Sequence, residues 1–573
     1  MNKEQINANY KLWLEKAVSD PDLPAELKAI EGDDEAVLDR FYRELEFGTA
    51  GLRGVIGAGP NRMNYYTVRR ATYGLAEYAK ELNPKSPSVA IAYDSRIKSD
   101  YFSEKAAEVL SACGVKVYMF RELMPTPMLS FAVRELKCDA GINMTASHNP
   151  AKFNGYKAYG SDGCQLGEEA ADIVLKKSMA IDIFNVPSVD FKDALVNGMI
   201  EYIGDDIIDK YYGEVKKQAI HPESSREAGL KVVYTPLNGA GNKPVRRILS
   251  DVGITNVIVV PEQELPDGNF PTCPYPNPEF REALELGLEL CRKEKPDLLL
   301  ATDPDCDRVG IAVPDGDDFA LFTGNEVGVM LLEYIARERI ATGTMPEKPV
   351  TIKSVVSTTL TEKICDDYGV ELITVLTGFK NIGEQITLLE KNNESERFIF
   401  AYEESYGYLA GDYCRDKDAV VAAMLICEMA AFYRSKGVSM VEARAKMYEK
   451  HGFFLNYVDN LAFEGASGME KMSKIMQGIR DNYPKSFAGI RVTAFNDFAK
   501  RERTDLITGE KSEIPLPKTN MVFFDLEGGA ALVVRPSGTE PKIKIYYTTI
   551  GKTPKDAEVI RQKIAEEIKE FFK

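Results

Sequence analysis

Short apolar runs alternate with amphipathic stretches along most of the chain. The runs are rich in β-branched and aromatic residues, which is typical of buried strands. They cover residues 88–93, 115–120, 230–234, 257–260, 297–301, 350–356, 398–402 and 531–534. The stretch 103–111 predicts a helix between the first two. Strands that alternate with helices predict α/β units with mixed or parallel sheets, and no short-period repeat suggests a solenoid.

Three other stretches predict features of the chain's organisation. Residues 419–427 are apolar but end at Glu428; nine residues cannot cross a bilayer, which needs about 20, so they predict a buried helix. Thr553 and Pro554 suit an N-cap and first helical position, and isoleucines follow at every fourth position, 560, 564 and 568. This pattern predicts a closing helix with one apolar face. Polar segments at 221–229 and 344–349 suggest breaks, and 500–519 suggests a long hairpin loop.

Length and charge narrow the class of protein. A chain of 573 residues predicts about three to five domains. The apolar fraction of 44% is that of an ordinary globular protein. The net charge of −17 excludes a general nucleic-acid or anionic-membrane binder, because such surfaces need a basic field. An anionic ligand would therefore need local cations.

The compartment is inferred from the first residues and the cysteines. The start, residues 1–7, has no apolar run of the kind found in a signal peptide. The nine cysteines are scattered, without a C-x-x-C pair. Reduced thiols in a cytoplasmic protein are the expected state.

A polar motif at 145–150 places Ser147 next to His148, and Asn154-Gly155-Tyr156-Lys157 follows. Adjacent side chains rarely form a nucleophile–base pair, and no G-x-S-x-G elbow surrounds the serine. Taken alone, the motif is equally typical of a polar turn.

Three carboxylates follow the strand at 297–301 at alternate positions: Asp303, Asp305 and Asp307. Oxygen ligands of this kind favour Mg²⁺, Mn²⁺ or Ca²⁺ over zinc. An EF-hand is excluded by Arg308 at its glycine position, and an aspartyl-phosphatase motif by Asp307 at its last position. A metal site is the best interpretation, with a solvated acidic loop as the alternative.

Three further loops carry groups suited to a phosphorylated sugar. Residues 535–542 combine an Arg, two hydroxyls and a glycine, as in a phosphate cradle, although an ordinary turn has the same composition. Residues 402–407 offer carboxylates and hydroxyls suited to sugar hydroxyls, with Lys417 further on. The glycine-rich segment 47–54 presents Arg53. The Gly57-Ala58-Gly59 that follows lacks the third glycine of a dinucleotide fingerprint.

In this order, the motifs resemble the α-D-phosphohexomutase superfamily, most closely its phosphoglucomutase and phosphopentomutase-like branch. The matching segments are 47–54, 145–150, 154–157, 303–308, 377–380, 403–407, 417–419 and 535–542. The resemblance implies three related α/β mixed-sheet domains plus a C-terminal α+β domain, heart-shaped around a central cleft. The implied boundaries are 1–206 for the phosphoserine loop, 207–323 for the metal loop, 324–451 for the sugar loop and 452–573 for the phosphate loop.

The resemblance also implies site residues. Ser147 would carry a phosphate, and one Mg²⁺ per chain would be bound by Asp303, Asp305, Asp307 and an oxygen of that phosphate. Lys157 would be the general acid/base, with His148 as an alternative proton carrier. The ordinary pKa of a lysine, about 10.4, would have to be lowered at Lys157 by Arg53, Arg308 and Mg²⁺. The implied substrate-binding residues are Arg308, Thr377, Gly378, Lys380, Glu403, Ser405, Lys417, Arg535, Ser537, Gly538 and Thr539.

Two departures and one supporting pair complete the resemblance. Pro304 and Cys306 stand where the family commonly has small residues such as glycine. Neither is a ligand position, but they could restrict the geometry of the metal loop. Asp94 and Arg96 match a family motif and are expected to play a supporting part.

The implied activity interconverts glucose 1-phosphate and glucose 6-phosphate, with glucose 1,6-bisphosphate as intermediate and activator. Phosphopentomutase or phosphomannomutase activity is the nearest alternative. A glucose 1,6-bisphosphate synthase and a non-catalytic sugar-phosphate sensor are further alternatives. A small phosphosugar is the expected partner, with no nucleic acid and no membrane. The sequence does not specify an oligomeric state.

Overall fold

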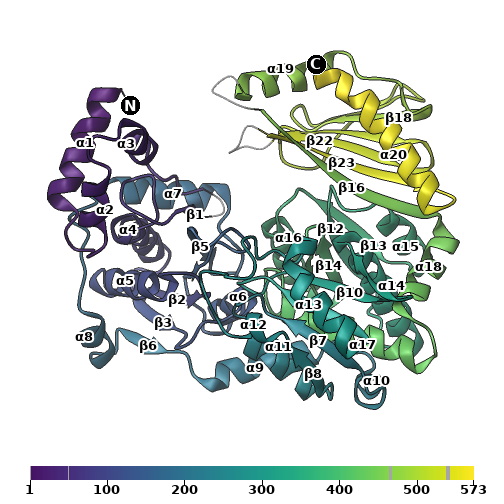
Figure 1. Cartoon of the computed structure of the whole chain (residues 1–573), viewed down its shortest axis with the longest axis horizontal. Helices are drawn as coiled ribbons and strands as arrows, with labels where there is room; N and C mark the ends of the chain where they lie inside the picture. Colours follow the sequence, from purple (N-terminus) through teal and green to yellow (C-terminus); the bar gives the residue numbers. More distant parts are fainter. Residues whose placement is uncertain (1, 49–50, 464–467, 537–541, 573) are drawn as a thin grey trace. The chain divides into compact units, whose positions relative to one another are not determined.

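A computed structural model describes residues 2–48, 51–463, 468–536 and 542–572 (Figure 1). The chain forms two compact units, each described separately below. The first comprises Met1–Gly324 and Phe379–Gly437, and the second comprises Asn325–Gly378 and Val438–Lys573. The chain therefore passes from the first unit into the second, returns to the first unit for residues 379–437, and ends in the second unit.

The first unit opens with three helices and a mixed sheet. The helices are α1 (Lys3–Lys16), α2 (Leu23–Ala29) and α3 (Asp34–Phe41). The sheet has the order β1-β5-β4-β2-β3-β6; β4, β2, β3 and β6 are parallel, whereas β5 and β1 are antiparallel. Its strands are β1 (Leu52–Val55), β2 (Ser88–Tyr93), β3 (Lys116–Met119), β4 (Ala140–Met144), β5 (Phe153–Gly160) and β6 (Ile200–Tyr202). Its helices are α4 (Tyr65–Leu82), α5 (Ser99–Ala112), α6 (Thr126–Glu135), α7 (Glu168–Met179) and α8 (Phe191–Val196).

A second mixed sheet of this unit has the order β11-β10-β9-β7-β8. Strands β8, β7 and β9 are parallel, and β10 and β11 are antiparallel. The strands are β7 (Lys231–Thr235), β8 (Asn256–Val259), β9 (Leu298–Thr302), β10 (Val309–Asp315) and β11 (Asp318–Phe322). The helices are α9 (Asp205–Lys216), α10 (Pro222–Glu227), α11 (Asn242–Asp251), α12 (Pro261–Glu264) and α13 (Arg281–Glu294).

The remainder of the first unit is the segment 379–437. It contains α16 (Phe379–Lys391), the antiparallel pair β14 (Phe398–Glu403) and β15 (Gly407–Leu409), and α17 (Ala419–Ser435). Every residue of α17 from Ala419 to Phe432 is buried, which confirms the predicted core helix. Asp418 caps this helix by accepting hydrogen bonds from the backbone N–H groups of Val420 and Val421.

The second unit combines a parallel strand pair with a large antiparallel sheet. Its first part contains α14 (Gly324–Thr342, of which Gly324 belongs to the first unit), β12 (Val350–Ser354), α15 (Leu360–Tyr368) and β13 (Glu371–Val375). Its second part has the strand order β16-β23-β22-β21-β18-β19-β20, and β17 pairs with β18. The strands are β16 (Phe453–Ala462), β17 (Ser486–Phe487), β18 (Ile490–Asp497), β19 (Glu502–Asp505), β20 (Lys511–Glu513), β21 (Val522–Leu526), β22 (Ala531–Pro536) and β23 (Lys542–Gly551). Its helices are α18 (Met440–His451), α19 (Gly468–Asp481) and α20 (Pro554–Lys569).

Helices α19 and α20 lie on one face of the large sheet (Figure 1). Met476 from α19 and Ile564 and Ile568 from α20 join the strand residues in one apolar core. The side chain of Thr553 accepts a hydrogen bond from Asp556 N, so the predicted closing helix and its cap are confirmed. Ile560, at the start of the same stripe, is only partly buried.

The predicted strands and the helix around 103–111 are confirmed, with shifts of a few residues at their ends. One loop prediction is wrong. The segment 500–519 is not a loop throughout: it contains the half-buried strand β19 and the exposed strand β20, which pair with each other as a hairpin that extends the sheet. The polar segment 221–229, predicted as a break, contains the short helix α10, which begins at Pro222, where proline suits the first helical turn.

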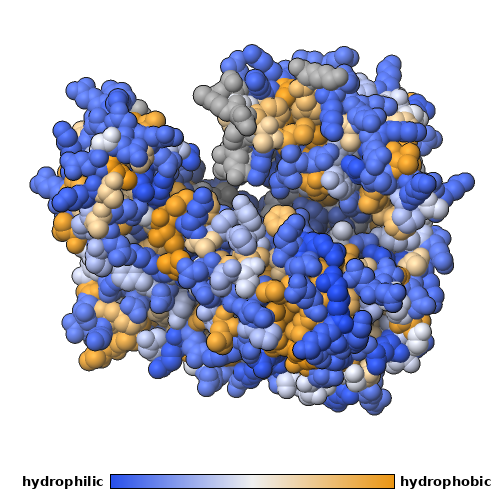
Figure 2. All heavy atoms as spheres, in the orientation of Figure 1, coloured by the Kyte–Doolittle hydropathy of each residue, from blue (hydrophilic) through white to orange (hydrophobic). Residues whose placement is uncertain are grey.

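Hydrophilic residues cover most of the face in view in Figure 2, with hydrophobic residues scattered among them. The acidic excess of the sequence is therefore compatible with a well-solvated exterior. Within the part of the chain that the structure describes, no helix is long and apolar enough to cross a membrane.

The C-terminal core gives a stability prediction. Ile564→Ala removes a fully buried side chain, so it should lower the stability of this domain by about 3 kcal/mol. Hydrogen exchange of the backbone amides in β22 and β23 measures the change. Ile560→Ala, on the same helix face but only partly buried, should have a clearly smaller effect. Equal effects of the two substitutions would contradict the packing described.

Candidate active site

The serine loop, residues 145–150, connects β4 to β5. Its backbone is held by hydroxyl groups: Ser147 N donates to Thr145 Oγ1 (2.8 Å), which donates to Asp94 Oδ2 (2.6 Å). Ser147 has a φ angle of 52°, in the left-handed region that residues with a Cβ rarely adopt. Such a conformation persists only where the surroundings enforce it, and it occurs often at active sites.

Arg96 enforces the shape of this loop. The side chain is 2% exposed, and its Nε lies 3.3 Å from Asp94 Oδ2. Its two terminal nitrogens donate to four backbone carbonyls of or next to the serine loop, those of Ser147, Asn149, Pro150 and Phe153. The guanidinium also lies 5.0 Å from the ring centroid of Phe270, which comes from the second sheet's domain. Arg96 is therefore more than the supporting residue suggested by sequence.

The metal loop, residues 303–307, connects β9 to β10, and its three aspartates are buried. The exposed fractions of Asp303, Asp305 and Asp307 are 0%, 0% and 1%, and their ligand atoms lie within 4.8 Å of one another. Burial contradicts the alternative of a solvated acidic loop. Cys306, between two of them, has a φ of 53°, which explains why a small residue suits this position.

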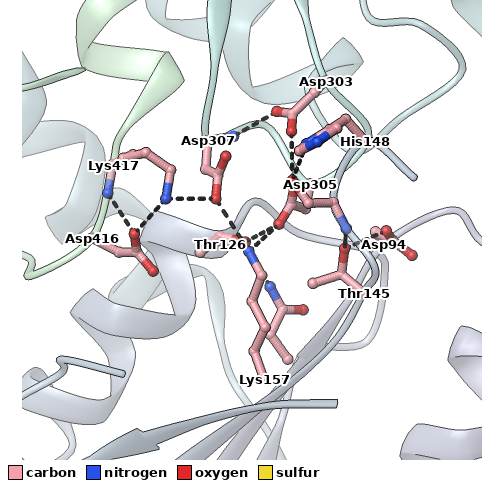
Figure 3. Close-up of polar contacts among 12 residues, drawn as sticks. Asp94, Thr126, Thr145, His148, Lys157, Asp303, Asp305, Asp307, Asp416 and Lys417 are labelled. Carbon is pink, nitrogen blue, oxygen red and sulfur yellow. Dashed lines mark hydrogen bonds and ion pairs between the residues drawn. The ribbon is translucent and has the colours of Figure 1, made fainter. Parts of the chain in front are cut away.

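One oxygen of each carboxylate is occupied by donors from the protein. Asp303 Oδ1 accepts from the N–H groups of Asp307 and Arg308, both at 3.0 Å. Asp305 Oδ2 accepts from Thr126 Oγ1 (2.8 Å) and Lys157 Nζ (2.7 Å). Asp307 Oδ2 lies 3.2 Å from Lys157 Nζ and 3.1 Å from Lys417 Nζ. Figure 3 shows these side chains converging.

The other oxygen of each carboxylate remains available. Asp303 Oδ2 accepts a hydrogen bond from Ser147 Oγ at 3.0 Å. Asp305 Oδ1 and Asp307 Oδ1 are buried without a hydrogen-bond partner among the described residues. Buried carboxylate oxygens without partners are costly, and three buried carboxylates that each bring one ligand atom within 4.8 Å of the others suit a hard divalent cation. The residues present therefore fit a metal ion held beside the serine hydroxyl.

The charges around the triad differ from the expected arrangement at Lys157. Burial alone would lower the pKa of Lys157, but the carboxylates of Asp305 and Asp307 outweigh burial and raise it. The protein groups alone therefore do not produce the lowered pKa expected with Arg53, Arg308 and Mg²⁺, because the groups that contact the ammonium are anions. Burial also raises the pKa of Asp303, and the two neighbouring aspartates raise it further. Lys157 overcomes the same burial effect at Asp305 and lowers the pKa of that carboxyl.

His148 lies in a different electrostatic environment. Its Nδ1 is 3.2 Å from Ser147 Oγ. Burial, followed by the charges of Arg308 and Arg53, lowers its pKa well below the ordinary value of histidine. The imidazole is therefore neutral at physiological pH.

Other predicted residues of the first unit line the same region or lie near it. Lys417 Nζ bridges Asp307 to Asp416, with a distance of 3.0 Å to Asp416 Oδ1. Arg308 Nε lies 3.9 Å from Asp307 Oδ1. Arg53 is exposed on β1 and donates from Nη1 to Asn149 Oδ1 at 3.4 Å.

Three further predicted substrate-binding residues of this unit lie on or next to regular elements. Glu403 is buried at the end of β14, Ser405 is half-buried in the following turn, and Lys380 is half-buried in the first turn of α16. Thr377, Gly378 and Arg535 belong to the second unit, where Arg535 is half-buried on β22. Ser537, Gly538 and Thr539 lie outside the described residues.

Sequence reasoning missed two residues of this site. Thr126 contacts Asp305, but Pro125-Thr126-Pro127 is typical of a turn and carries no sign of a role. Asp416 holds Lys417 and accepts a hydrogen bond from Tyr159 OH at 2.8 Å. Its position directly before the Lys417 motif was the one available signal.

Three family profiles match this chain in succession. They are described as phosphoglucomutase/phosphomannomutase, alpha/beta/alpha domains I, II and III, and they match residues 44–182, 209–316 and 323–451. The matched segments are α/β in content, and the chain after them is the sheet-rich domain with α19 and α20, as expected.

Individual proteins that are similar in sequence to this chain belong to the same family as the profiles. A phosphoglucomutase of Staphylococcus saprophyticus is 38% identical over 510 residues, which cover 89% of this chain and 91% of that protein. A phosphoglucomutase of Staphylococcus haemolyticus is 35% identical over 512 residues, with the same coverage.

Solved structures share the fold. The exocytosis-sensitive phosphoprotein parafusin (phosphoglucomutase) from Paramecium, in its open form, superposes with a TM-score of 0.71 at 17% identity, covering 92% of this chain and 96% of that one. A phosphoglucomutase/phosphomannomutase family protein from Burkholderia thailandensis gives a TM-score of 0.64 at 17% identity, covering 92% and 97%. The three profiles and the relatives that are 35–38% identical show that the chain belongs to the phosphoglucomutase/phosphomannomutase family.

Proposed function

We propose that this protein is a phosphoglucomutase that interconverts α-D-glucose 1-phosphate and glucose 6-phosphate through a phosphorylated Ser147 and glucose 1,6-bisphosphate. The observation that carries the proposal is the 3.0 Å contact between Ser147 Oγ and Asp303 Oδ2, inside a buried carboxylate triad. A nucleophilic hydroxyl held against a hard-cation site is suited to phosphoryl transfer. The relatives that are 35–38% identical carry the name phosphoglucomutase, which supports this choice.

The cation of the proposal is Mg²⁺, one per chain, held by the available oxygens of Asp303, Asp305 and Asp307. When bound, it would withdraw negative charge from the phosphoryl group on Ser147. An oxygen of that phosphoryl group would be a further ligand of the cation.

The serine loop supports both half-reactions. In the first, a sugar hydroxyl attacks phosphorus: the bond from phosphorus to Ser147 Oγ breaks, a bond to the sugar oxygen forms, the sugar hydroxyl proton passes to a base, and the leaving serine oxygen takes up a proton. In the second, Ser147 Oγ attacks the other phosphoryl group of the bisphosphate: the serine proton passes to a base, the bond from that phosphorus to the sugar oxygen breaks, and the sugar oxygen takes up a proton. The sugar reorients between the steps while Arg96 and Thr145 keep the serine backbone in place.

We assign exchange of the proton on Ser147 Oγ to His148, and general acid/base and electrostatic roles at the phosphoryl group to Lys157. His148 is neutral and lies 3.2 Å from the serine oxygen, whereas Lys157 is held as an ammonium by two carboxylates. An ammonium stabilises negative charge that develops on the phosphoryl oxygens and can donate a proton to a leaving oxygen. Arg53 and Arg308 would add positive charge at the same place.

The remaining residues are proposed to hold the sugar and its second phosphate. Glu403 and Ser405 would bind sugar hydroxyls that look alike in both orientations. Lys380, Lys417, Thr377 and Gly378 would bind further substrate groups. The phosphate that does not react would bind to Arg535, Ser537, Gly538 and Thr539, since one cradle must accept either end of the sugar.

Replacement of the nucleophile tests the mechanism. Ser147→Ala should lower kcat by at least about 1,000-fold, because the covalent step loses its acceptor. Intact-mass and peptide analysis should also find no phosphate in the serine loop. Ser161→Ala, in an exposed turn, is the control and should keep both activity and phosphorylation. Full turnover by Ser147→Ala would refute the mechanism, and a folded, inert wild type without phosphate would favour a sensor.

The sugar is decided by steady-state rates on glucose, mannose and ribose 1-phosphates with glucose 1,6-bisphosphate present. We expect kcat/KM for glucose 1-phosphate to exceed the other two by at least about tenfold, since discrimination by buried polar contacts reaches that size. A higher value for mannose or ribose 1-phosphate would instead make the protein a phosphomannomutase or a phosphopentomutase.

A further inference from the structure

Thr126, the first residue of α6, contacts the metal loop twice. Its backbone N–H donates to the carbonyl oxygen of Asp305 at 2.9 Å, and its hydroxyl donates to Asp305 Oδ2 at 2.8 Å. The side chain is fully buried, with an exposed fraction of 0%. One residue from the domain of the serine loop thus holds both the backbone and the carboxylate of a residue in the next domain.

The direction of the hydroxyl is fixed by a second contact. Asn143 Nδ2 lies 2.8 Å from Thr126 Oγ1. A carboxylate only accepts hydrogen bonds and a hydroxyl has one proton, so the threonine must donate to Asp305 and accept from the asparagine amide. Asn143 belongs to β4, the strand that leads directly into the serine loop. The chain Asn143–Thr126–Asp305 therefore links that strand to the carboxylate (Figure 3 labels Thr126 and Asp305).

The contact decides which oxygen of Asp305 is available. Thr126 and Lys157 both bind Oδ2, and Oδ1 is left buried without a partner among the described residues. Lys157 is a long side chain with four rotatable bonds, and its charge is needed at the phosphoryl group. Thr126 is short, uncharged and anchored in the helix, so it can keep the carboxylate oriented while Lys157 moves.

We propose that Thr126 is a positioning residue of the metal site, which fixes the Asp305 carboxylate so that Oδ1 faces the cation. Asn143 connects Thr126 to the strand that leads into the serine loop, so that the nucleophile and the metal ligand keep a fixed position relative to each other. The inference rests on the proposed function, because it assumes that the triad holds a divalent cation. Partners in the outer shell of a metal typically change its affinity by 10- to 100-fold.

A purely structural role for the threonine makes a different prediction. Thr126 also begins α6, where the cap residue Pro125 makes no side-chain hydrogen bond, so the hydroxyl could serve stability alone. Loss of the hydroxyl would then lower the melting temperature and leave the metal affinity unchanged. Thr72 provides the matched control, because it is a buried helical threonine of the same domain whose hydroxyl donates to Val68 O at 2.8 Å, within its own helix.

The test is calorimetric titration of Mg²⁺, and separately of Mn²⁺, into the full-length wild type and variants of equal phosphorylation state, checked by intact mass. Thr126→Val should weaken the metal Kd by about 10- to 100-fold. Thr126→Ser, which keeps the hydroxyl, should stay within about threefold of the wild type. Thr72→Val should lower the melting temperature without changing the metal Kd. Thr126→Ala, which cannot overpack the site, replaces the valine variant if that variant does not fold.

The outcomes separate the two proposals. Equal metal affinity in the wild type and in the Thr126 variant without a hydroxyl would overturn the positioning role and leave the proposed function intact. Equal losses of metal affinity in the Thr126 and Thr72 variants would overturn it too, since the effect would then be one of stability. A wild type that binds neither metal would refute the metal site itself and with it the positioning role.

Discussion

Three aspartates within five residues are buried side by side, and the rest of the site depends on how their repulsion is compensated. No single element of the fold could supply the compensation. Lys157 comes from β5, Lys417 from the segment before α17, and Arg308 from the end of the metal loop itself. Carboxylates buried without such partners would take up protons instead of staying charged. A chain of net charge −17 thus gathers its cations where the anionic substrate is proposed to bind.

Two networks of contacts meet at the contact between Ser147 and Asp303. One network, with Arg96 at its centre, holds the serine loop through backbone carbonyls and keeps a residue with a Cβ in the left-handed region. The other fixes one oxygen of every aspartate with N–H, hydroxyl or ammonium donors. The first network leaves the hydroxyl of Ser147 free to react, and the second leaves one oxygen of each aspartate for a cation. The nucleophile and the cation site are therefore preorganised before a substrate arrives.

Sequence patterns predicted the strands and the core helix well, because buried strands and helices depend on local runs of apolar residues. The spacing of the three aspartates suggested a metal site, and the family resemblance of the motifs added Ser147 and Lys157 to the same candidate site. The pKa direction at Lys157 in the protein alone could not be predicted, because it depends on which charges lie closest in space. Thr126 was missed for the same reason: a threonine between two prolines is ordinary until the fold places Asp305 against it. The strands β19 and β20 within the expected hairpin loop were missed because these charged strands lack an apolar face.

In the proposed mechanism, the free carboxylate oxygens and the phosphorylated serine together form one cation site. A crystal structure of the phosphorylated enzyme with Mn²⁺ in place of Mg²⁺, using anomalous scattering to locate the metal, tests this arrangement. We predict one peak about 2.1 Å from Asp303 Oδ2, Asp305 Oδ1, Asp307 Oδ1 and an oxygen of the phosphate on Ser147. A metal bound elsewhere, or held by Asp305 Oδ2 with Thr126 displaced, would contradict it.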